Sequence, residues 1–385
     1  MDTVAWLLDS DPSIRWQVLR DLTDEPPEAV AEERAKVATE GWGARLLALQ
    51  RTDGQWGADV VDHIEVAAEG PLPSLEDRQL LRELIGLSQA RMARWFGVDE
   101  ADIASWETPE PDLKPEHEER YRAALQWMRS AIGTLFPPWT STAFTLQLLR
   151  DLGLDPTSGQ ARRAVALVRD TSRWEEGGQA FFNGEVEPCI NGRVVALGAY
   201  FGEDVEVVVD RLLGEQLDDG GWNCEAERGS TRSSFHTTIC VLEGLLEYER
   251  ATGGSTEVAA VRARGEEYLL ERELFRRRSS GEVIDADWTR FSFPTWWHYD
   301  VLRGLDHLRN VGAEPDERCG EAIELVRSKR DQDGRWRLEN RHPGRMHFEV
   351  DDGEGSPSHW NTLRALRVLD WYASAHRRDP APTPR

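Results

Sequence analysis

The chain has 385 residues, with 70 acidic and 46 basic side chains and a formal net charge of −24. This acidic surplus argues against a nucleic-acid binder or a protein that docks on anionic lipid, because both depend on basic residues that neutralise phosphates. With no apolar run of about 18 residues, no signal-peptide pattern at the start and only four cysteines, we expect a soluble, cytoplasmic protein without a membrane span or a disulfide framework.

Six short apolar segments recur along the chain and predict buried helices. Between them lie longer amphipathic segments, with apolar residues at i, i+3 and i+4, which predict helices packed on one side only. Since no stretch alternates with period two, the expected fold is all-α, with inner and outer helices alternating. The inner segments are 14–22, 141–152, 191–199, 236–245, 298–305 and 359–366, and the outer segments are 28–50, 159–173, 205–216, 257–273 and 315–330.

Three outer segments end in a turn that contains an Asp-Gly pair before a tryptophan: 50–56, 216–222 and 329–336. The glycine permits a positive φ, so the tryptophan can fold back onto the helix that precedes it. These turns account for part of the 16 tryptophans in the chain. We therefore predict that they staple the helices together and have no catalytic role.

These Gln…Gly-x-Trp turns resemble the repeats of squalene–hopene cyclases. The repeated region is similar to the α/α toroid of terpenoid cyclases and protein prenyltransferase β subunits. Six inner helices suit one closed barrel of that kind. The resemblance covers residues 1–58 and 138–375 and implies an α/α toroid with an apolar substrate in the barrel cavity.

Residues 59–137 interrupt the first repeat and predict a small inserted helical domain. Within it, the stretch from Leu87 through Phe96-Gly97-Val98 to Trp106 resembles a helix-turn-helix of the Cro/repressor type. Its recognition helix would begin near Asp99 with a cluster of carboxylates, which argues against DNA. We expect residues 72–129 to bind a protein partner or to cover the barrel rim where the inner helices begin. The tail, 376–385, has three prolines and is predicted to be disordered.

Candidate metal ligands gather at the starts of two neighbouring inner segments. Glu187 and Cys189 precede the third, His236 opens the fourth, and Cys224 lies between them. Two thiolates, an imidazole and a carboxylate are typical zinc ligands, so we predict a zinc site in which Glu187 completes or tunes the coordination. Cys240 and Cys319 are expected to be buried core residues.

This pattern also resembles the zinc site of protein prenyltransferases, with Glu187 in place of the usual aspartate. The additional Cys224 makes the set similar to the Cys-Cys-His zinc of lanthionine cyclases. If the fourth position of the site is open, it would permit Lewis-acid chemistry or the activation of a thiol or of water. The chain departs from prenyltransferases because the basic residues that hold a diphosphate are missing before Glu187, and Arg193 and Arg232 are the only cations nearby.

Other residues offer acid–base and binding chemistry. The segment 349–352 is similar to the acidic motif of squalene-type cyclases, with Asp351 and Asp352 as candidate acids. His298 and Asp300 are a candidate acid/base pair at the start of the fifth inner segment. Apolar-pocket candidates are the aromatic residues Trp288, Phe291, Phe293, Trp296, Trp297 and Trp360; Arg193, Trp296, Trp297 and Trp360 are the predicted substrate contacts.

The sequence thus supports three interpretations. The first is a zinc-dependent enzyme of the terpenoid cyclase/prenyltransferase type that acts on an isoprenoid-like or thiol-bearing substrate, including a peptide. The second is a metal-free terpene cyclase that uses Asp351 or Asp352 as the initiating acid. The third is a non-catalytic, lipid-sensing or regulatory protein whose helix-turn-helix binds a partner or DNA.

Overall fold

All regular secondary structure in the described residues is helical. The computed structural model describes residues 2–111, 113–174 and 177–378, and β-type pairing within them is confined to isolated bridges. The all-α prediction is therefore confirmed. Across these same ranges, no helix combines the length and the apolar character that a bilayer crossing requires.

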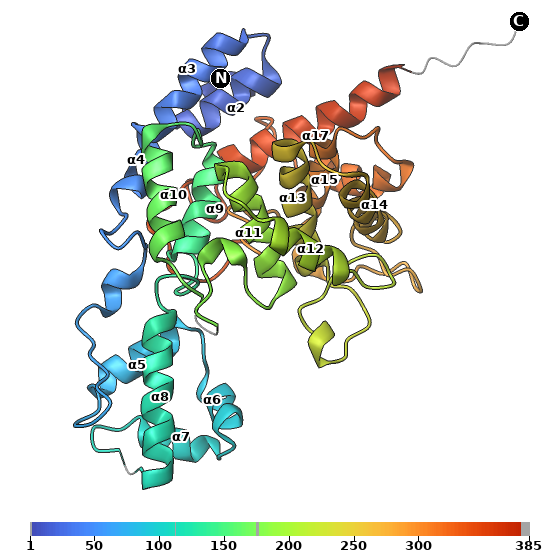
Figure 1. Cartoon of the computed structure of the whole chain (residues 1–385). Coiled ribbons are helices and arrows are strands. Elements are labelled where there is room, and N and C mark those ends of the chain that lie inside the picture. Colours follow the sequence, from blue (N-terminus) through green and yellow to red (C-terminus); the bar gives the residue numbers. More distant parts are fainter. Residues whose placement is uncertain (1, 112, 175–176, 379–385) are drawn as a thin grey trace, which may run out of the picture.

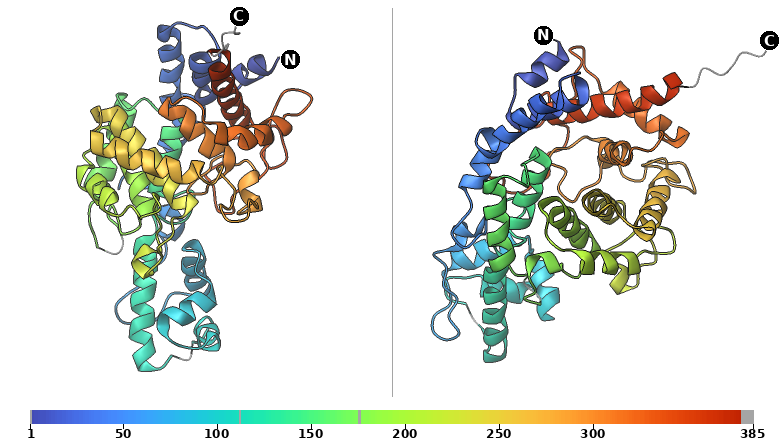
Figure 2. Two further views of the ribbon diagram at one scale, coloured as in Figure 1. Left: turned by 90° about the vertical axis from the view of Figure 1, so that its right-hand side faces the viewer. Right: turned by 45° about the horizontal axis from the view of Figure 1, so that its top comes forward.

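The six apolar segments form helices that contact one another in a circuit (Figures 1 and 2). Contacts run from α9 through α11, α13, α15 and α17 to α2. The indole Nε1 of Trp16 on α2 then donates to the carbonyl of Leu152 on α9, at 3.0 Å. These helices are α2 (Pro12–Leu22), α9 (Thr142–Leu152), α11 (Pro188–Phe201), α13 (Phe235–Thr252), α15 (Val301–Val311) and α17 (His359–Arg378).

The amphipathic segments form the helices outside this circuit, with two departures from the prediction. Segment 28–50 is broken, because Gly41 has φ +62° and the Trp42 amide donates to Asp11 Oδ2 at 2.8 Å. The short helix α1 (Thr3–Leu8) was not predicted. The outer helices are α3 (Pro27–Ala35), α4 (Gly41–Ala48), α10 (Gly159–Thr171), α12 (Glu206–Gly214), α14 (Thr256–Leu270) and α16 (Gly320–Ser328).

The predicted disorder from residue 376 is corrected for its first three residues. Helix α17 continues to Arg378, and residues 379–385 lie outside the described part of the chain. The helix extends further because the apolar pattern of its first turns is followed by residues that are compatible with a helix until the first proline.

The tryptophan turns are confirmed as staples between consecutive helices. Each indole Nε1 donates to a carbonyl of the preceding outer helix, and each tryptophan amide donates to a threonine hydroxyl of the next inner helix. The indole bonds are Trp56 to Leu46, Trp222 to Leu212 and Trp336 to Val326, at 2.7–2.8 Å; the amide bonds reach Thr142, Thr238 and Thr362, at 3.0–3.2 Å. Gly220 has φ +97°, which explains the glycine in the middle turn.

Trp222→Phe is expected to lower the free energy of unfolding by about 2–4 kcal/mol. The change leaves the Leu212 carbonyl unpaired and a void where the fully buried indole packs. Urea unfolding followed by circular dichroism measures it. Val207→Ala on the same outer helix is the control, since Val207 is 76% exposed and its loss is expected to cost less than about 0.5 kcal/mol. Equal effects of the two variants would contradict the stapling role.

The inserted segment has its own hydrophobic core. Its helices are α5 (Leu75–Leu84), α6 (Gln89–Phe96), α7 (Glu100–Trp106) and α8 (Pro115–Ala131). Their buried side chains form a cluster separate from the main core. Figure 1 shows this unit projecting from the end of the molecule at which α9 begins. Gly97, with φ +69°, makes the predicted turn between α6 and α7, and Asp99 caps α7.

Candidate metal centre

Helices α11 and α13 approach each other closely because glycine faces glycine where they meet. A Cβ on Gly244 would lie 2.2 Å from the carbonyl oxygen of Gly192, and a Cβ on Gly192 would lie 2.6 Å from the carbonyl group of Cys240. No other residue type permits such an approach. The start of α11 is thereby held beside the connection that leads into α13.

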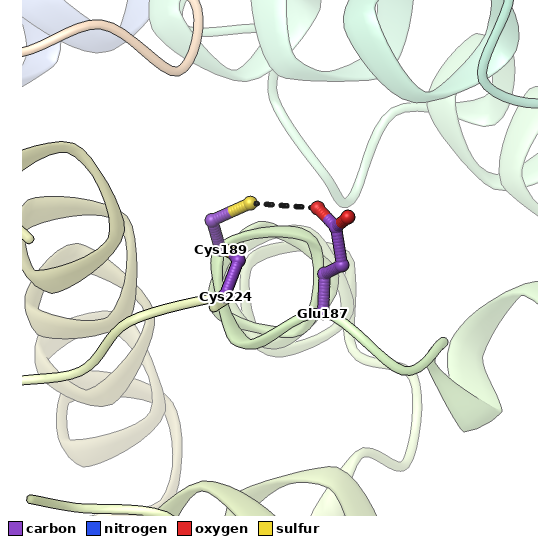
Figure 3. A group of neighbouring side chains, drawn as sticks. All are labelled: Glu187, Cys189 and Cys224. Atoms are coloured by element: carbon purple, nitrogen blue, oxygen red, sulfur yellow. Dashed lines mark hydrogen bonds between the residues drawn. The ribbon is translucent and has the colours of Figure 1, made fainter. Parts of the chain in front are cut away.

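Three of the four predicted metal ligands meet at this point. Glu187 is the residue directly before α11, Cys189 lies in its first turn, and Cys224 lies in the connection between α12 and α13. One ligand atom from each lies within 4.8 Å of the other two. Figure 3 shows the Cys189 thiol pointing to the Glu187 carboxylate, with Sγ 3.6 Å from Oε2. Both thiols are partly buried, while Glu187 is exposed.

The two thiols shift each other's pKa in opposite directions. Their mutual hydrogen bond is the main reason that the pKa of Cys189 is raised and that of Cys224 lowered; burial adds to the rise at Cys189. The Cys224 Sγ also lies 3.4 Å from the hydroxyl of Thr237 on α13. Cys224 is therefore the thiol that ionises first, and its sulfur lies between Cys189 and Thr237.

A buried cation lies one turn along α11 from Cys189. Arg193 is 8% exposed, and its guanidinium group stacks 4.5 Å from the ring of Phe144 on α9. Its Nε and Nη1 have no hydrogen-bond partner among the described residues. The charge of Arg193 lowers the pKa of the Cys189 thiol, although less than hydrogen bonding and burial raise it. Arg193 thus favours negative charge at this end of α11.

The donor set fits a zinc ion. Thiolates are soft ligands that suit zinc, and a carboxylate completes a set of three that leaves one tetrahedral position open. Two thiolates and a carboxylate around Zn²⁺ would carry one net negative charge. The buried Arg193 offsets that charge, as does the N-terminal end of α11. The cluster of Glu187, Cys189 and Cys224 can hold a metal ion.

The structure does not bring His236, the fourth predicted ligand, into this cluster. Its Nδ1 accepts a hydrogen bond from the Tyr299 amide at 2.8 Å, and its ring packs edge-on against Trp297 and His298. Burial lowers the pKa of His236 to about 4. The imidazole is turned toward the connection before α15, a contact that sequence spacing does not reveal.

The predicted acid/base pair of His298 and Asp300 is not formed. Asp300 is 2% exposed and caps α15: its carboxylate accepts hydrogen bonds from the Arg303 amide at 2.7 Å and from the amide and hydroxyl of Ser292. The His298 ring is stacked between Trp297 and His342, at centroid distances of 3.7 and 3.6 Å. The two side chains therefore serve different contacts.

The acidic segment before α17 does not form a paired acid. Asp351 accepts hydrogen bonds from the Ser358 hydroxyl at 2.5 Å and the His359 amide at 3.0 Å, so it holds the start of α17. Asp352 is exposed, and Glu349 pairs with Arg341 at 2.5 Å. These contacts offer no support for the metal-free cyclase.

The predicted aromatic residues do not line one pocket, because they belong to separate stacking pairs. Trp296 is 2% exposed and stacks on Trp139, with centroids 5.0 Å apart. Trp297 is 37% exposed and stacks on His298. Phe293 and Trp360 stack on each other and line the cavity that the inner helices enclose. That cavity has a volume of about 350 Å³ and is lined mainly by charged side chains, which the sequence reasoning missed.

The chain matches no protein-family model, and no curated protein or solved structure resembles it at a significant level.

Proposed function

We propose that the chain is a zinc-dependent enzyme of the terpenoid cyclase/prenyltransferase type, with an α/α toroid as its scaffold. Glu187, Cys189 and Cys224 hold the metal at the rim where the inner helices begin. The substrate is a molecule that supplies a thiol or is attacked by water. The observation that carries the proposal is the convergence of two thiols and a carboxylate within 4.8 Å.

The scaffold assignment is supported by the contacts between helices. Inner helices follow one another in a circuit, and each tryptophan turn ties an outer helix to the inner helix that comes after it.

The chain's own residues provide the rest of the chemistry. A bound zinc would supply a Lewis acid that lowers the pKa of a coordinated thiol or water. Cys224, whose pKa is already lowered, needs the least energy to become a thiolate ligand. Arg193 has two nitrogens without partners among the described residues, so it can bind an anionic group of the substrate beside the metal.

Elemental mass spectrometry of protein purified with a reducing agent and without chelator tests the proposal. We expect about one zinc per chain, lost in Cys189→Ser and in Cys224→Ser because a hydroxyl is a poor zinc ligand. His236→Ala is expected to retain zinc, since His236 lies outside the cluster. Cys319→Ala is the control, because Cys319 is buried elsewhere. Absence of zinc from the reduced wild-type protein would overturn the proposal.

We further propose that the inserted unit binds a protein. The exposed first turn of α7 would face DNA in a helix-turn-helix complex, and it carries Glu100 and Asp102 after the capping Asp99. On α6, Trp95 is 50% exposed and stacks edge-on against Trp127. Aromatic side chains of this kind are enriched at protein interfaces. A gel shift with genomic fragments at low salt tests the DNA alternative, and retardation would contradict the protein interpretation.

A further inference from the structure

A ring of charged side chains lies inside the circuit of inner helices. When the six inner segments are aligned, the same position carries Arg20 on α2, Arg150 on α9, Glu243 on α13, Arg303 on α15 and Arg364 on α17. All five line the central cavity. Only α11 has an apolar residue, Leu197, at this position. A charged residue therefore recurs at the same position of five of the six inner helices, which indicates that the charged lining is a repeated feature of this fold.

None of the three residues of the candidate metal centre lines this cavity. Its lining includes Gly153, Tyr200, Arg250 and Asn310, each at or near the C-terminal end of an inner helix. The metal cluster lies at the opposite, N-terminal end of α11. The lining also reaches the start of α17 at Trp360, so the two sites are distinguished by the residues that form them and not by the full length of the inner helices.

The charge of this cavity is opposite in sign to that of the chain. Eight arginines and four carboxylates line it, whereas the whole chain has a net charge of −24. Some of the arginines are paired: Arg303 with Glu243 at 2.6 Å, and Arg150 with Glu247 at 3.0 Å. Arg20 and Arg367 both pair with Asp21, which lies outside the lining, so part of the positive excess of the lining is neutralised from there.

Two arginines of the lining lack an anionic partner, and a third is buried more deeply than its single partner compensates. Within the described ranges, Arg34 and Arg250 form no ion pair: Arg34 donates to the Gly153 carbonyl and the Tyr200 hydroxyl, and Arg250 to the Asn310 carbonyl. Arg367 is 6% exposed, and its Nε has no hydrogen-bond partner in the same part of the chain. Burial lowers the pKa of Arg367 to about 10 although Asp21 is beside it. An anion in the cavity would relieve this cost.

We propose that this cavity is a second binding site, for a small organic molecule that carries two or more phosphate or carboxylate groups. Guanidinium groups match these oxyanions through paired hydrogen bonds, and several of them converge here from different helices. The volume of about 350 Å³ suits a small metabolite. The stacked rings of Phe293 and Trp360 form its apolar wall and would contact the organic part of the ligand. This site goes beyond the proposed zinc chemistry and does not depend on it.

Isothermal titration calorimetry at low salt, with inorganic pyrophosphate, inorganic phosphate and citrate as probes, tests the proposal. We expect pyrophosphate or citrate to bind at one site per chain at least tenfold more tightly than phosphate, because they engage more arginines. Tighter binding of pyrophosphate would identify the ligand's charged groups as phosphates, and tighter binding of citrate would identify them as carboxylates. No measurable binding of either at millimolar concentration would overturn the site.

Two arginines suit mutation because neither belongs to an ion pair of the described residues. Arg34→Gln with Arg250→Gln is expected to weaken pyrophosphate at least tenfold, while Arg162→Gln, an exposed residue on the outer helix α10, leaves it unchanged. Equal affinity in both proteins would mean non-specific anion binding and overturn the site.

A second comparison separates this site from the zinc centre. Cys189→Ser with Cys224→Ser is expected to bind pyrophosphate like the wild-type protein. Loss of binding in that variant would assign the anion to the metal end and refute the cavity site. If zinc is absent but pyrophosphate binds and responds to Arg34→Gln with Arg250→Gln, the zinc proposal fails and the cavity site stands.

Discussion

Arg303→Leu is expected to lower the free energy of unfolding by about 3–5 kcal/mol, the typical cost of removing one partner from a buried ion pair. Arg303 is 3% exposed, and its Nε and Nη2 donate to the Glu243 carboxylate at 2.8 and 2.6 Å. Burial by itself raises the pKa of Glu243, but the charge and hydrogen bonds of Arg303 outweigh it and hold this pKa below its ordinary value. Without Arg303, the Glu243 carboxylate would remain at the central cavity with no direct partner.

The same arginine also ties the start of α15 to the connection before it. Its Nη1 donates to the carbonyls of His298 and Trp296, at 2.6 and 3.2 Å. Removing Glu243 as well relieves the unpaired carboxylate but not these two carbonyls. We therefore expect Arg303→Leu with Glu243→Leu to recover part of the lost stability, and both variants to be measured by urea unfolding at neutral pH.

Arg278→Leu is the matched control. Arg278 pairs with Glu271 at 2.6 Å on the surface, where its side chain is 58% exposed, so its loss is expected to cost less than about 1 kcal/mol. A similar cost for Arg278 and Arg303 would show that the pair of Arg303 and Glu243 at the central cavity is as well solvated as a pair on the surface. That result would also weaken the case for a desolvated anion site.

The repeated helices could be predicted because their signal is local. The tryptophan turns combine a glycine that must have positive φ with an indole whose partner lies ten residues earlier, as Trp222 and Leu212 show. The helix-turn-helix likewise depended on a short pattern around Gly97. In both cases the residues that form the structure are close together in the chain.

The side-chain partners across helices could not be predicted in the same way. Cys189 and Cys224 meet because Gly192 and Gly244 allow two helices to touch, whereas His236 turns to the Tyr299 amide, 63 residues away. Spacing places a residue near the start of a helix but does not fix its rotamer. The ring of charged residues could have been predicted from the sequence. Arginine or glutamate recurs at the same position of otherwise apolar segments, as at Arg150 and Arg303.

Acid is expected to destabilise the protein strongly between pH 6.5 and pH 5. Burial is the main cause that lowers the pKa of four histidines: to about 4 for His236, His342 and His347, and to about 2 for His298. In the unfolded chain an imidazole takes up a proton near pH 6.5, whereas these four stay neutral when folded. The unfolded state therefore binds more protons over this range, so stability falls as the pH falls.

The expected loss by pH 5 is roughly 1–2 kcal/mol for each histidine, which is large against the total stability of a typical domain. Asp151 opposes it, because burial raises the pKa of this carboxyl to about 6. Its folded form gains a proton between pH 6 and pH 4 while the unfolded form does not, so it adds stability as the pH falls. One carboxyl offsets only part of the effect of four imidazoles.

Urea midpoints at pH 7.5, 6.5, 5.5 and 5.0 measure this dependence. They should be taken on Cys189→Ser with Cys224→Ser, so that release of a metal by protonated thiols does not contribute. Adding His298→Gln and His342→Gln is expected to flatten the slope, since these stacked rings no longer titrate. His63→Gln, whose side chain is 61% exposed, is the matched control and should leave the slope unchanged. A midpoint that stays constant from pH 7.5 to 5.0 would mean that the stacked imidazoles accept protons in the folded protein as easily as in water, and would contradict the expected destabilisation by acid.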